Sequence, residues 1–570
     1  MKNISFFLSL IAVSCFSQTG SRKVYNTTLT YSEIVSSYES FSKQSPFVKL
    51  FSCGTTDVGK PLQLFVISKT KEFDPDSLKK KNKRILLINN GIHPGEPDGI
   101  DASVEMVKTL LAKPSEIPDD VVICIIPVYN IDGCLNRGKY SRANQNGPEE
   151  YGFRGNAQNL DLNRDFVKAD SKNARSFMEI FQKWKPDVFV DTHTSDGADY
   201  QYVMTLIATQ HDKLNPILSD FMVKEMLPVL YDKMKQGQYE MTPYVETKDE
   251  TPESGITEFL ETPRFSTGYA AQFNTIGFVS ESHMWKPYND RVWATYEFIF
   301  SLLQATEKFS DKIGKLKAQA DASVKTQKEF PLNWELDTTV FDPIDFKGYE
   351  AIHKPSTITG LPRLYYDRSK PYTKKISFYH HYKPSESVSK ADVYIVPQAW
   401  QKVIERLKLN GVQMKQLNSD TAISCSVYYI SGFETSKNPY EGHYVHYKIK
   451  TRSEKQELKF FKGDYLIETD QSANRYIVET LEPGCEDSFF AWGFFDAILQ
   501  QKEWFSDYVF EEKAEEILKN DPKLKTQLDE KRKSDKNFAS NHMAQMSFIY
   551  HNSPYYEKSH NRYPVARVLH

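Results

Sequence analysis

The stretch RILLINNGIHPGEPDGIDASVEMVKTLL, residues 84–111, predicts a strand, a loop and a helix in succession. Its first part, residues 84–90, is an Ile- and Leu-rich run that ends in two asparagines. Apolar side chains at helical spacing follow, at Ile100, Val104, Val107 and Leu111. The loop between them carries His93 and Glu96 directly after the strand. A histidine and a carboxylate in that place could bind a metal, or could be an ordinary loop pair.

The strand and helix patterns continue to about residue 305. Short, unbroken apolar runs recur at residues 121–128, 187–191 and 276–280, as is typical of strands that helices cover on both faces. Helical patterns lie between and after them, at Phe177, Ile180, Phe181 and Trp184, and at Val292, Tyr296, Ile299 and Leu303. We therefore predict an α/β domain with a parallel or mixed sheet flanked by helices.

Composition excludes several classes of protein. The chain has 570 residues with ordinary apolar and charged fractions, which is enough for two to four globular domains. Its formal net charge of −3 is too small to attract nucleic acid or anionic lipid, so we expect no nucleic-acid partner. Beyond the N-terminus no apolar run reaches the roughly 18 residues of a membrane span, which predicts no transmembrane segment.

The N-terminus predicts export. Lys2 precedes the apolar residues 4–16, and small residues surround position 17, so residues 1–17 have the pattern of a signal peptide cleaved before Gln18. Lipidation at Cys15 is the less favoured alternative, because the three residues before it fit a lipidation box poorly. The enzyme or binding protein would then be periplasmic or secreted. The five remaining cysteines are widely spaced and predict neither a disulfide framework nor a cysteine zinc cluster.

The sequence pattern changes near residue 310. A Lys-rich segment, residues 311–330, is predicted to be a linker between the α/β domain at 18–310 and an accessory C-terminal region at 331–570. The accessory region has short Tyr- and Thr-rich strands, a helix near 398–409 and a mostly helical tail from Ser488. Its many aromatic residues predict that it packs on the α/β domain.

A third potential ligand makes the metal interpretation of His93 and Glu96 more specific. A catalytic zinc ion needs three protein ligands and one open position. His193 follows the predicted strand 187–191, just as the first pair follows its own strand. Ligands bind at the carboxyl ends of the strands in open α/β sheets, so these three residues are predicted to meet around one zinc ion per chain. The simpler alternative is that both histidines are buried and hydrogen-bonded.

A carboxylate at the end of a fourth strand suits a general base. Glu281 follows the run 276–280 and has no zinc-ligand spacing of its own. It would therefore reach the same rim of the sheet and act on water at the metal. Glu258, Glu261 and His283 are the alternatives for this role.

Three further motifs give the chain a resemblance to the zinc carboxypeptidase family of the carboxypeptidase A type. Residues 54–62, GTTDVGKPL, resemble the family's early Gly-x-Ser-x-x-Gly-Arg-x-Leu hairpin. Asn130-Ile131-Asp132-Gly133 resembles its Asn-Pro-Asp-Gly turn, and residues 161–166, DLNRDF, closely match its Asp-x-Asn-Arg-Asn-Phe. The resemblance implies a phosphorylase/hydrolase-like mixed sheet. The unusual surroundings of Glu281 imply a divergent, bacterial-looking branch with an extra C-terminal region.

The resemblance also implies roles for single residues. Asn163 and Arg164 would hold the terminal carboxylate of the substrate, because a guanidinium pairs with a carboxylate through two parallel hydrogen bonds. Asp161 would accept the second N–H of His93 and fix its tautomer.

Two implied roles have several candidates. Arg154 would stabilise the oxyanion of the transition state. It is preferred over Arg142 and Arg137 because it follows an aromatic residue. Tyr269, next to a glycine, is the candidate for the family's mobile tyrosine, although it lies closer to Glu281 than the family pattern leads one to expect.

The chain is accordingly interpreted as an exported zinc metallocarboxypeptidase that hydrolyses the C-terminal peptide bond of peptides with a free C-terminus. Two alternatives within the family are an amidase or deacylase and a cell-wall peptide hydrolase. A third, from another functional class, is a binding protein on a degenerate peptidase scaffold.

Overall fold

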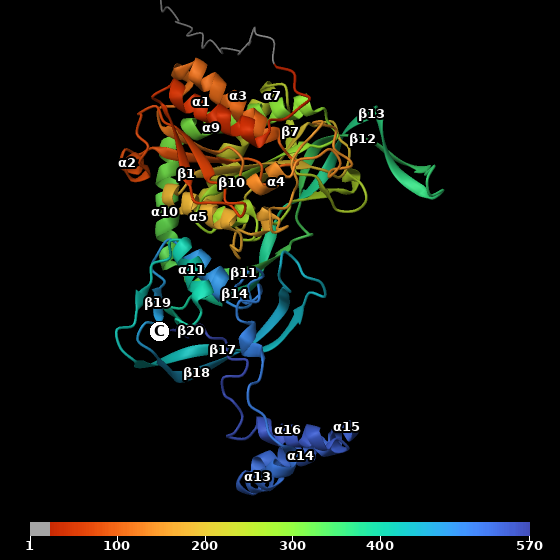
Figure 1. The fold of residues 1–570 in the computed structure, drawn as a ribbon. Helices are drawn as coiled ribbons and strands as arrows, with labels where there is room; N and C mark the ends of the chain where they lie inside the picture. Colours follow the sequence, from red (N-terminus) through yellow and green to blue (C-terminus); the bar gives the residue numbers. More distant parts are fainter. Residues whose placement is uncertain (1–22, 570) are drawn as a thin grey trace, which may run out of the picture.

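The computed structural model describes residues 23–569, so the predicted signal peptide, residues 1–17, lies outside the described part of the chain (Figure 1). Its centre is an eight-stranded sheet in the order β1-β2-β4-β3-β5-β10-β6-β7. The strands, in that order, are Val48–Cys53, Leu62–Ile67, Val121–Ile126, Arg84–Asn89, Val188–Ser195, Ile276–His283, Met204–Ala208 and Met241–Pro243. The central strands β4, β3, β5 and β10 run parallel, whereas β1, β2 and β6 each have an antiparallel neighbour. The predicted mixed α/β sheet is confirmed.

Helices cover both faces of this sheet. Figure 1 shows α1 (Tyr31–Gln44), α3 (Asp98–Ala112) and α9 (Tyr288–Lys308) on one side and α5 (Lys172–Trp184) on the other. Every residue of β3, β4, β5 and β10 is buried, which explains the apolar run that each of these strands contains. The other helices of this part are α2 (Pro75–Lys80), α4 (Ile131–Leu135), α6 (Pro216–Phe221), α7 (Leu227–Gln236) and α8 (Ser266–Ala271).

The segment predicted to be a linker, residues 311–330, is instead mostly helical. Helix α10 spans Ser310–Thr326, and strand β11 (Glu329–Leu336) begins three residues later. Ile313, Ala320 and Val324 are buried. Their spacing of seven and four residues places them on one helical face. Lys317 shares this face and donates to the Phe273 and Asn274 carbonyls, whereas Lys312, Lys315 and Lys325 lie on the other faces. Lysine content alone suggested a linker, but the apolar stripe determines the structure.

Three further sheets lie wholly or partly in the accessory region. The long strands β12 (Asp342–Pro355) and β13 (Pro362–Tyr379) pair, and β13 continues onto β9 (Ile256–Thr257) and β8 (Glu246–Thr247) of the catalytic region. Strand β14 (Tyr382–Ser389) pairs with β11. A six-stranded sheet has the order β16-β19-β15-β20-β17-β18, with strands Lys415–Gln416, Tyr465–Glu468, Val393–Val396, Ala566–Val568, Thr421–Thr435 and His446–Phe460.

Helices of the accessory region lie in two places. Helices α11 (Gln401–Leu409) and α12 (Asn474–Leu481) border the catalytic region, whereas α13 (Asp507–Asn520), α14 (Pro522–Ser534), α15 (Lys536–Ala539) and α16 (His542–His551) form a separate cluster at the far end of the molecule (Figure 1). The tail predicted to be helical from Ser488 begins with turns, and its first α-helix starts at Asp507. Within residues 23–569, none of the helices combines the length and the apolar character that crossing a bilayer requires.

The accessory region packs closely on the catalytic region. Phe273 stacks on Tyr476 with ring centroids 5.4 Å apart. Arg264 forms a 2.7 Å ion pair with the buried Asp487, and its guanidinium lies over the Trp492 ring. A buried ion pair and stacked aromatic rings hold two surfaces in a fixed orientation, so the packing expected from the aromatic content is present.

Candidate metal centre and active site

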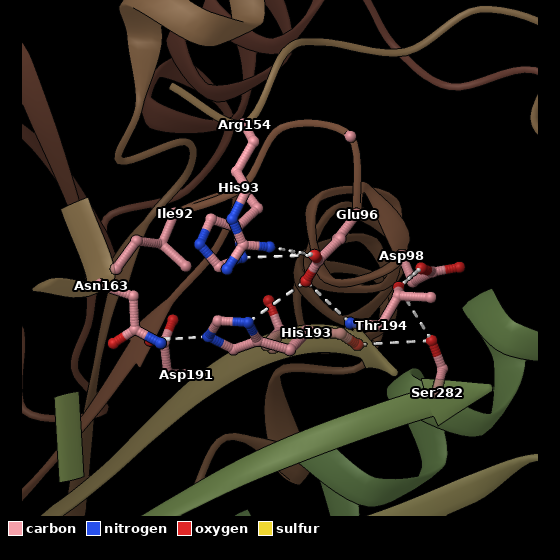
Figure 2. Close-up of polar contacts among 12 residues, drawn as sticks. Ile92, His93, Glu96, Asp98, Arg154, Asn163, Asp191, His193, Thr194 and Ser282 are labelled. Carbon is pink, nitrogen blue, oxygen red and sulfur yellow. Dashed lines mark hydrogen bonds and ion pairs between the residues drawn. The ribbon is translucent and has the colours of Figure 1, made fainter. Parts of the chain in front are cut away.

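Two histidines and a glutamate meet where strands β3 and β5 end. His93 and Glu96 lie in the loop between β3 and α3, and His193 is near the end of β5. One ligand atom from each of these residues lies within 4.8 Å of the ligand atoms of the other two, and all three side chains are buried. Figure 2 shows both imidazole rings directed at the Glu96 carboxylate. The structure therefore brings together the three residues predicted to be metal ligands.

The separations of these atoms match a tetrahedral zinc site. His93 Nδ1 lies 3.3 Å from Glu96 Oε1, and His193 Nδ1 lies 3.2 Å from Glu96 Oε2. With ligand bonds of about 2.0–2.1 Å, the corners of a tetrahedron are about 3.3–3.4 Å apart. His93 Nδ1 is buried and has no hydrogen-bond partner among residues 23–569. An orphaned nitrogen of this kind fits a metal ligand, so the residues present suit the ion.

The far nitrogen of each ring is held by an aspartate. His93 Nε2 lies 2.8 Å from Asp161 Oδ1, and His193 Nε2 lies 3.0 Å from Asp191 Oδ2. A carboxylate that accepts the Nε2–H fixes the tautomer in which Nδ1 carries the lone pair. Both rings thus present Nδ1 to the same point. Asp161 takes the position predicted for it, whereas Asp191 was not predicted, although it stands two residues before His193 in the same strand.

Glu96 is held in its ionised form by several donors. The Thr194 N–H donates to Oε2 at 2.9 Å, and Arg142 donates to Oε1 at 2.8 Å. Burial alone would raise the pKa of Glu96, but His93 and Arg142 outweigh it and hold that pKa well below its usual range. An ionised, fixed carboxylate is what a divalent ion requires.

Glu281 lies beside the histidine of the neighbouring strand. In the parallel pairing of β5 and β10, Glu281 is opposite His193, so the two side chains project from the same face of the sheet. Glu281 is 9% exposed and lines the same pocket as the three ligands. Burial, partly offset by His193, raises its pKa to about 8. This is a carboxylate within the pocket that is not among the three ligands.

A pocket of about 330 Å³ opens above these residues. Asn163, Arg164 and Arg154 line it, and so does Arg142. Other lining residues include Thr194, Ser195, Asp196, Ile207, Tyr244, Phe259, Glu261, Phe265 and Val279. The predicted site residues other than Asp161 and Tyr269 therefore share one cavity.

The two residues predicted to bind the substrate carboxylate are firmly positioned. Asn163 Oδ1 accepts from the Ser266 N–H at 3.1 Å. The Arg164 guanidinium lies 4.3 Å from the centroid of the Phe265 ring, and its Nε donates to Tyr440 Oη at 3.0 Å. Since Tyr440 belongs to the accessory region, that region takes part in fixing the wall of the pocket.

Of the arginine candidates, Arg154 and Arg142 reach the pocket and Arg137 does not. Arg154 donates from Nε to Asp161 Oδ2 at 2.9 Å, and its side chain is 44% exposed. Arg142 is more buried and pairs with Glu96. Arg137 donates to the backbone carbonyls of Thr28 and Leu29.

The structure does not place Tyr269 at the substrate pocket. Its side chain is 0% exposed in helix α8, packs on Phe166 and donates to Asn410 at 2.7 Å. The neighbouring Gly268 is in close contact with the Thr262 carbonyl, where a Cβ atom would collide, so this glycine permits close packing. The tyrosine in the pocket wall is Tyr244, which lies in the interval between His193 and Glu281 but has no distinguishing motif.

The alternatives to Glu281 lie in other surroundings. Glu258 does not line the pocket and accepts from Gln210. Glu261 lines it, but its carboxylate accepts from the Thr267 N–H at 2.9 Å. His283 is buried, with Nε2 2.8 Å from the Ala198 carbonyl.

Comparison with known proteins agrees with this geometry. The family model described as zinc carboxypeptidase matches residues 34–285. Carboxypeptidase 2 of Trichophyton equinum is 21% identical over 447 residues, covering 71% of this chain and 73% of the relative. Carboxypeptidase 2 of Trichophyton rubrum is 21% identical over 446 residues, with the same coverage. The alignment with the first of these relatives covers 71% of this chain, which is more than residues 1–285 amount to. The similarity therefore extends beyond residue 285, where the match to the family model ends.

Solved structures similar to this chain include two carboxypeptidases. The metallo-carboxypeptidase from Burkholderia cenocepacia has 15% identity, covers 50% of this chain and 70% of its own, and gives a TM-score of 0.36. Carboxypeptidase A from Helicoverpa armigera has 15% identity, with 50% and 76% coverage and a TM-score of 0.35. The matched family model, the carboxypeptidase relatives and the group His93, Glu96 and His193 support one conclusion. Residues 34–285 belong to the zinc carboxypeptidase family, and the chain is a zinc-dependent metallopeptidase.

Proposed function

We propose that this protein is an exported metallocarboxypeptidase that removes the C-terminal residue of peptides with a free carboxylate. One observation carries the proposal: the pocket above the metal ligands is also lined by Asn163, Arg164 and Glu281. An amide donor and a guanidinium in the same cavity as a metal site suit a substrate whose terminal carboxylate lies one residue from the bond to be cleaved.

The metal site and Glu281 together account for the chemical step. A zinc ion held by His93, Glu96 and His193 supplies Lewis-acid activation of water and of the scissile carbonyl. Glu281 takes a proton from the attacking water and returns it to the leaving amine. Burial raises the pKa of Glu281 to about 8, so its ionised form holds an accepted proton more strongly than an exposed carboxylate does.

Arg154 stabilises the developing oxyanion. Its guanidinium pairs with Asp161 through Nε and Nη2 and donates from Nη1 to Glu96 Oε1 at 3.4 Å, and the side chain stays 44% exposed at the pocket. Arg142 is more buried and donates to the same Glu96 oxygen at 2.8 Å, so its main role is to support the metal ligand. A fixed positive charge near the carbonyl oxygen lowers the free energy of the transition state more than that of the ground state.

Arg164 and Asn163 bind the terminal carboxylate, and Tyr244 contributes the aromatic hydroxyl of the pocket in place of Tyr269. Arg164 is supported by Phe265 beneath it and by Tyr440 at its edge. Holding a guanidinium in one orientation reduces the entropy lost when it forms two parallel hydrogen bonds.

The test compares one peptide series with free and with amidated C-termini, on zinc-loaded protein, and follows the products by mass. An exopeptidase should release single residues from the free peptides and should lose roughly 2–4 kcal/mol of binding, about 30- to 1,000-fold in kcat/KM, on amidation. Equal cleavage of both forms would favour an amidase or an endopeptidase. Internal cleavage products alone would exclude the carboxylate clamp.

Export has its own test. Expression of the full chain in a bacterial host, followed by N-terminal sequencing of the protein recovered outside the cytoplasm, should give a chain that begins at Gln18. Recovery of uncleaved chain from the cytoplasm alone would contradict export.

A further inference from the structure

Three histidines from two distant parts of the chain meet away from the pocket. His211 lies in the turn after β6, in the catalytic region. His380 and His381 form the whole connection between β13 and β14, in the accessory region. One ring nitrogen of each lies within 4.8 Å of those of the other two. None of the three lines the pocket that holds the catalytic residues.

The ring geometry resembles that of a metal site. The ring centroids are 4.9 Å apart for His211 and His380, 5.1 Å for His211 and His381, and 4.4 Å for His380 and His381. His211 Nε2 lies 3.4 Å from His381 Nδ1. This separation equals the edge of a tetrahedron about a zinc ion with bonds of about 2.0–2.1 Å, and it is close to the ligand separations measured around Glu96.

Carboxylates surround these rings. Asp212 Oδ2 lies 3.3 Å from His211 Nε2, which again is a tetrahedral edge. Asp342 Oδ2 lies 2.8 Å from His380 Nε2, and Glu258 Oε2 lies 3.9 Å from His211 Nδ1. Aspartates and glutamates next to metal-binding histidines either complete the coordination or orient the rings.

Hydrogen bonds hold the backbone and the carboxylate in place. Asp212 Oδ2 accepts from the Tyr382 N–H at 2.7 Å. The His380 carbonyl accepts from Gln210 Nε2 at 2.8 Å, and the His381 carbonyl accepts from the Asp337 N–H at 2.8 Å. The backbone that carries these rings is therefore held by hydrogen bonds of its own, in addition to the contacts of the ring nitrogens. Ligands fixed in advance lose little conformational entropy when an ion binds.

Two of the imidazoles favour the neutral form. Burial lowers the pKa of His211 to about 4 despite the nearby Asp212, and burial also lowers the pKa of His380. A histidine binds a metal only through an unprotonated nitrogen. Neutral imidazoles with a carboxylate are ligands that zinc accepts readily.

We propose that His211, His380 and His381 form a second zinc site, with Asp212, which lies beside His211, as the candidate fourth ligand. The site is separate from the catalytic one and does not depend on the proposed peptidase activity. It joins the turn after β6 to the β13–β14 connection, so the ion links the catalytic region to the accessory region. With Asp212 as the fourth ligand the coordination of the ion would be closed to substrate, which suits a structural zinc site.

The test measures zinc bound per chain after loading of the mature protein, residues 18–570, and desalting. Wild type should retain two equivalents and His380→Ala/His381→Ala one. The reciprocal variant, His93→Ala/His193→Ala, should also retain one. His353→Ala is the matched control, since His353 is an exposed histidine of the neighbouring hairpin that contacts only Glu250 among the described polar groups, and it should retain two.

Replacement of zinc by Co²⁺ identifies the ligands. In the His93→Ala/His193→Ala background, one equivalent of Co²⁺ should give a visible absorption band of a tetrahedral site, and His211→Gln in that background should abolish it. Zinc should raise the unfolding temperature of this background protein and not that of the version that also lacks His211.

Three results would overturn the proposal: one zinc in wild type, equal zinc in wild type and the His380→Ala/His381→Ala variant, or a second equivalent that is removed by desalting. A misfolded variant is recognised separately, because a chain that lacks only the second site should still retain the zinc bound at His93. Loss of peptidase activity in the His93→Ala/His193→Ala protein leaves the outcome of this experiment unchanged.

Discussion

Replacing Asp161 by asparagine tests two roles of its carboxylate, which are support of the metal ligand His93 and positioning of Arg154. Asp161 accepts from His93 Nε2 through one oxygen and from Arg154 through the other. Asparagine has nearly the same shape and can still accept from His93 with its carbonyl oxygen, but it has lost the charge. Its amide group, which only donates, must then face the Arg154 guanidinium, which also only donates.

The expected loss of zinc affinity follows from the loss of negative charge at position 161. A hydrogen bond to an ionised group contributes about 1.5–3 kcal/mol and a neutral one about 0.5–1.5 kcal/mol, so the exchange costs roughly 1–2 kcal/mol. That is about a 5- to 30-fold loss of zinc affinity, which overlaps the range of roughly 10- to 100-fold typical of residues that support metal-binding histidines. Competition with a chelator of known zinc affinity at fixed pH measures it.

The second effect appears only under zinc saturation. If Arg154 stabilises the oxyanion, its displacement should lower kcat of Asp161→Asn even when the site is fully loaded. Asp191→Asn is the matched control, because Asp191 supports His193 and has no contact with Arg154. It should lose zinc affinity by a similar factor and keep the kcat of wild type when loaded. Wild-type zinc affinity in Asp161→Asn would refute this account of the site.

Three further substitutions test other parts of the molecule. Glu281→Gln should keep its zinc and lose roughly 10²- to 10⁴-fold in kcat, and near-normal turnover would transfer the role of base to Glu261. Arg164→Ala should raise KM much more than it lowers kcat, and amidation of the substrate should cost this variant nothing further, a result that the double-mutant cycle on variant and substrate checks. Burial raises the pKa of Asp101 from 3.8 to about 6, so the folded chain keeps a proton that the unfolded chain loses, and stability should fall by up to roughly 3 kcal/mol as pH rises from about 4 to about 6. Denaturant unfolding of Asp101→Asn should show less of this fall, and identical pH profiles of the two proteins would contradict the assignment.

The metal ligands could be predicted from the sequence because each depends on local patterns. His93, Glu96 and His193 follow or end unbroken apolar strands, and the ends of neighbouring parallel strands must meet. Glu281 could be predicted for the same reason, since its strand pairs with that of His193.

Residues positioned by distant contacts could not be predicted. Tyr440 reaches Arg164 across 276 positions of sequence, and the Asp161 N–H donates to Glu441 across 280. No periodicity or motif marks these residues, because their place depends on how the accessory region packs. Tyr269 was misassigned for a related reason: a glycine in a sequence suggests mobility, but only the structure shows that Gly268 is needed for close packing.

Strand β20 has a consequence for the order in which the chain folds. It consists of residues 566–568 and lies between β15 and β17, whose residues are translated more than a hundred positions earlier. During synthesis, β15 and β17 therefore emerge without the strand that joins them, and their facing edges stay unpaired until residues 566–568 have left the ribosome. The accessory sheet can close only then, so a chain stopped before residue 566 should be cleaved within it by a protease that spares the chain with β20.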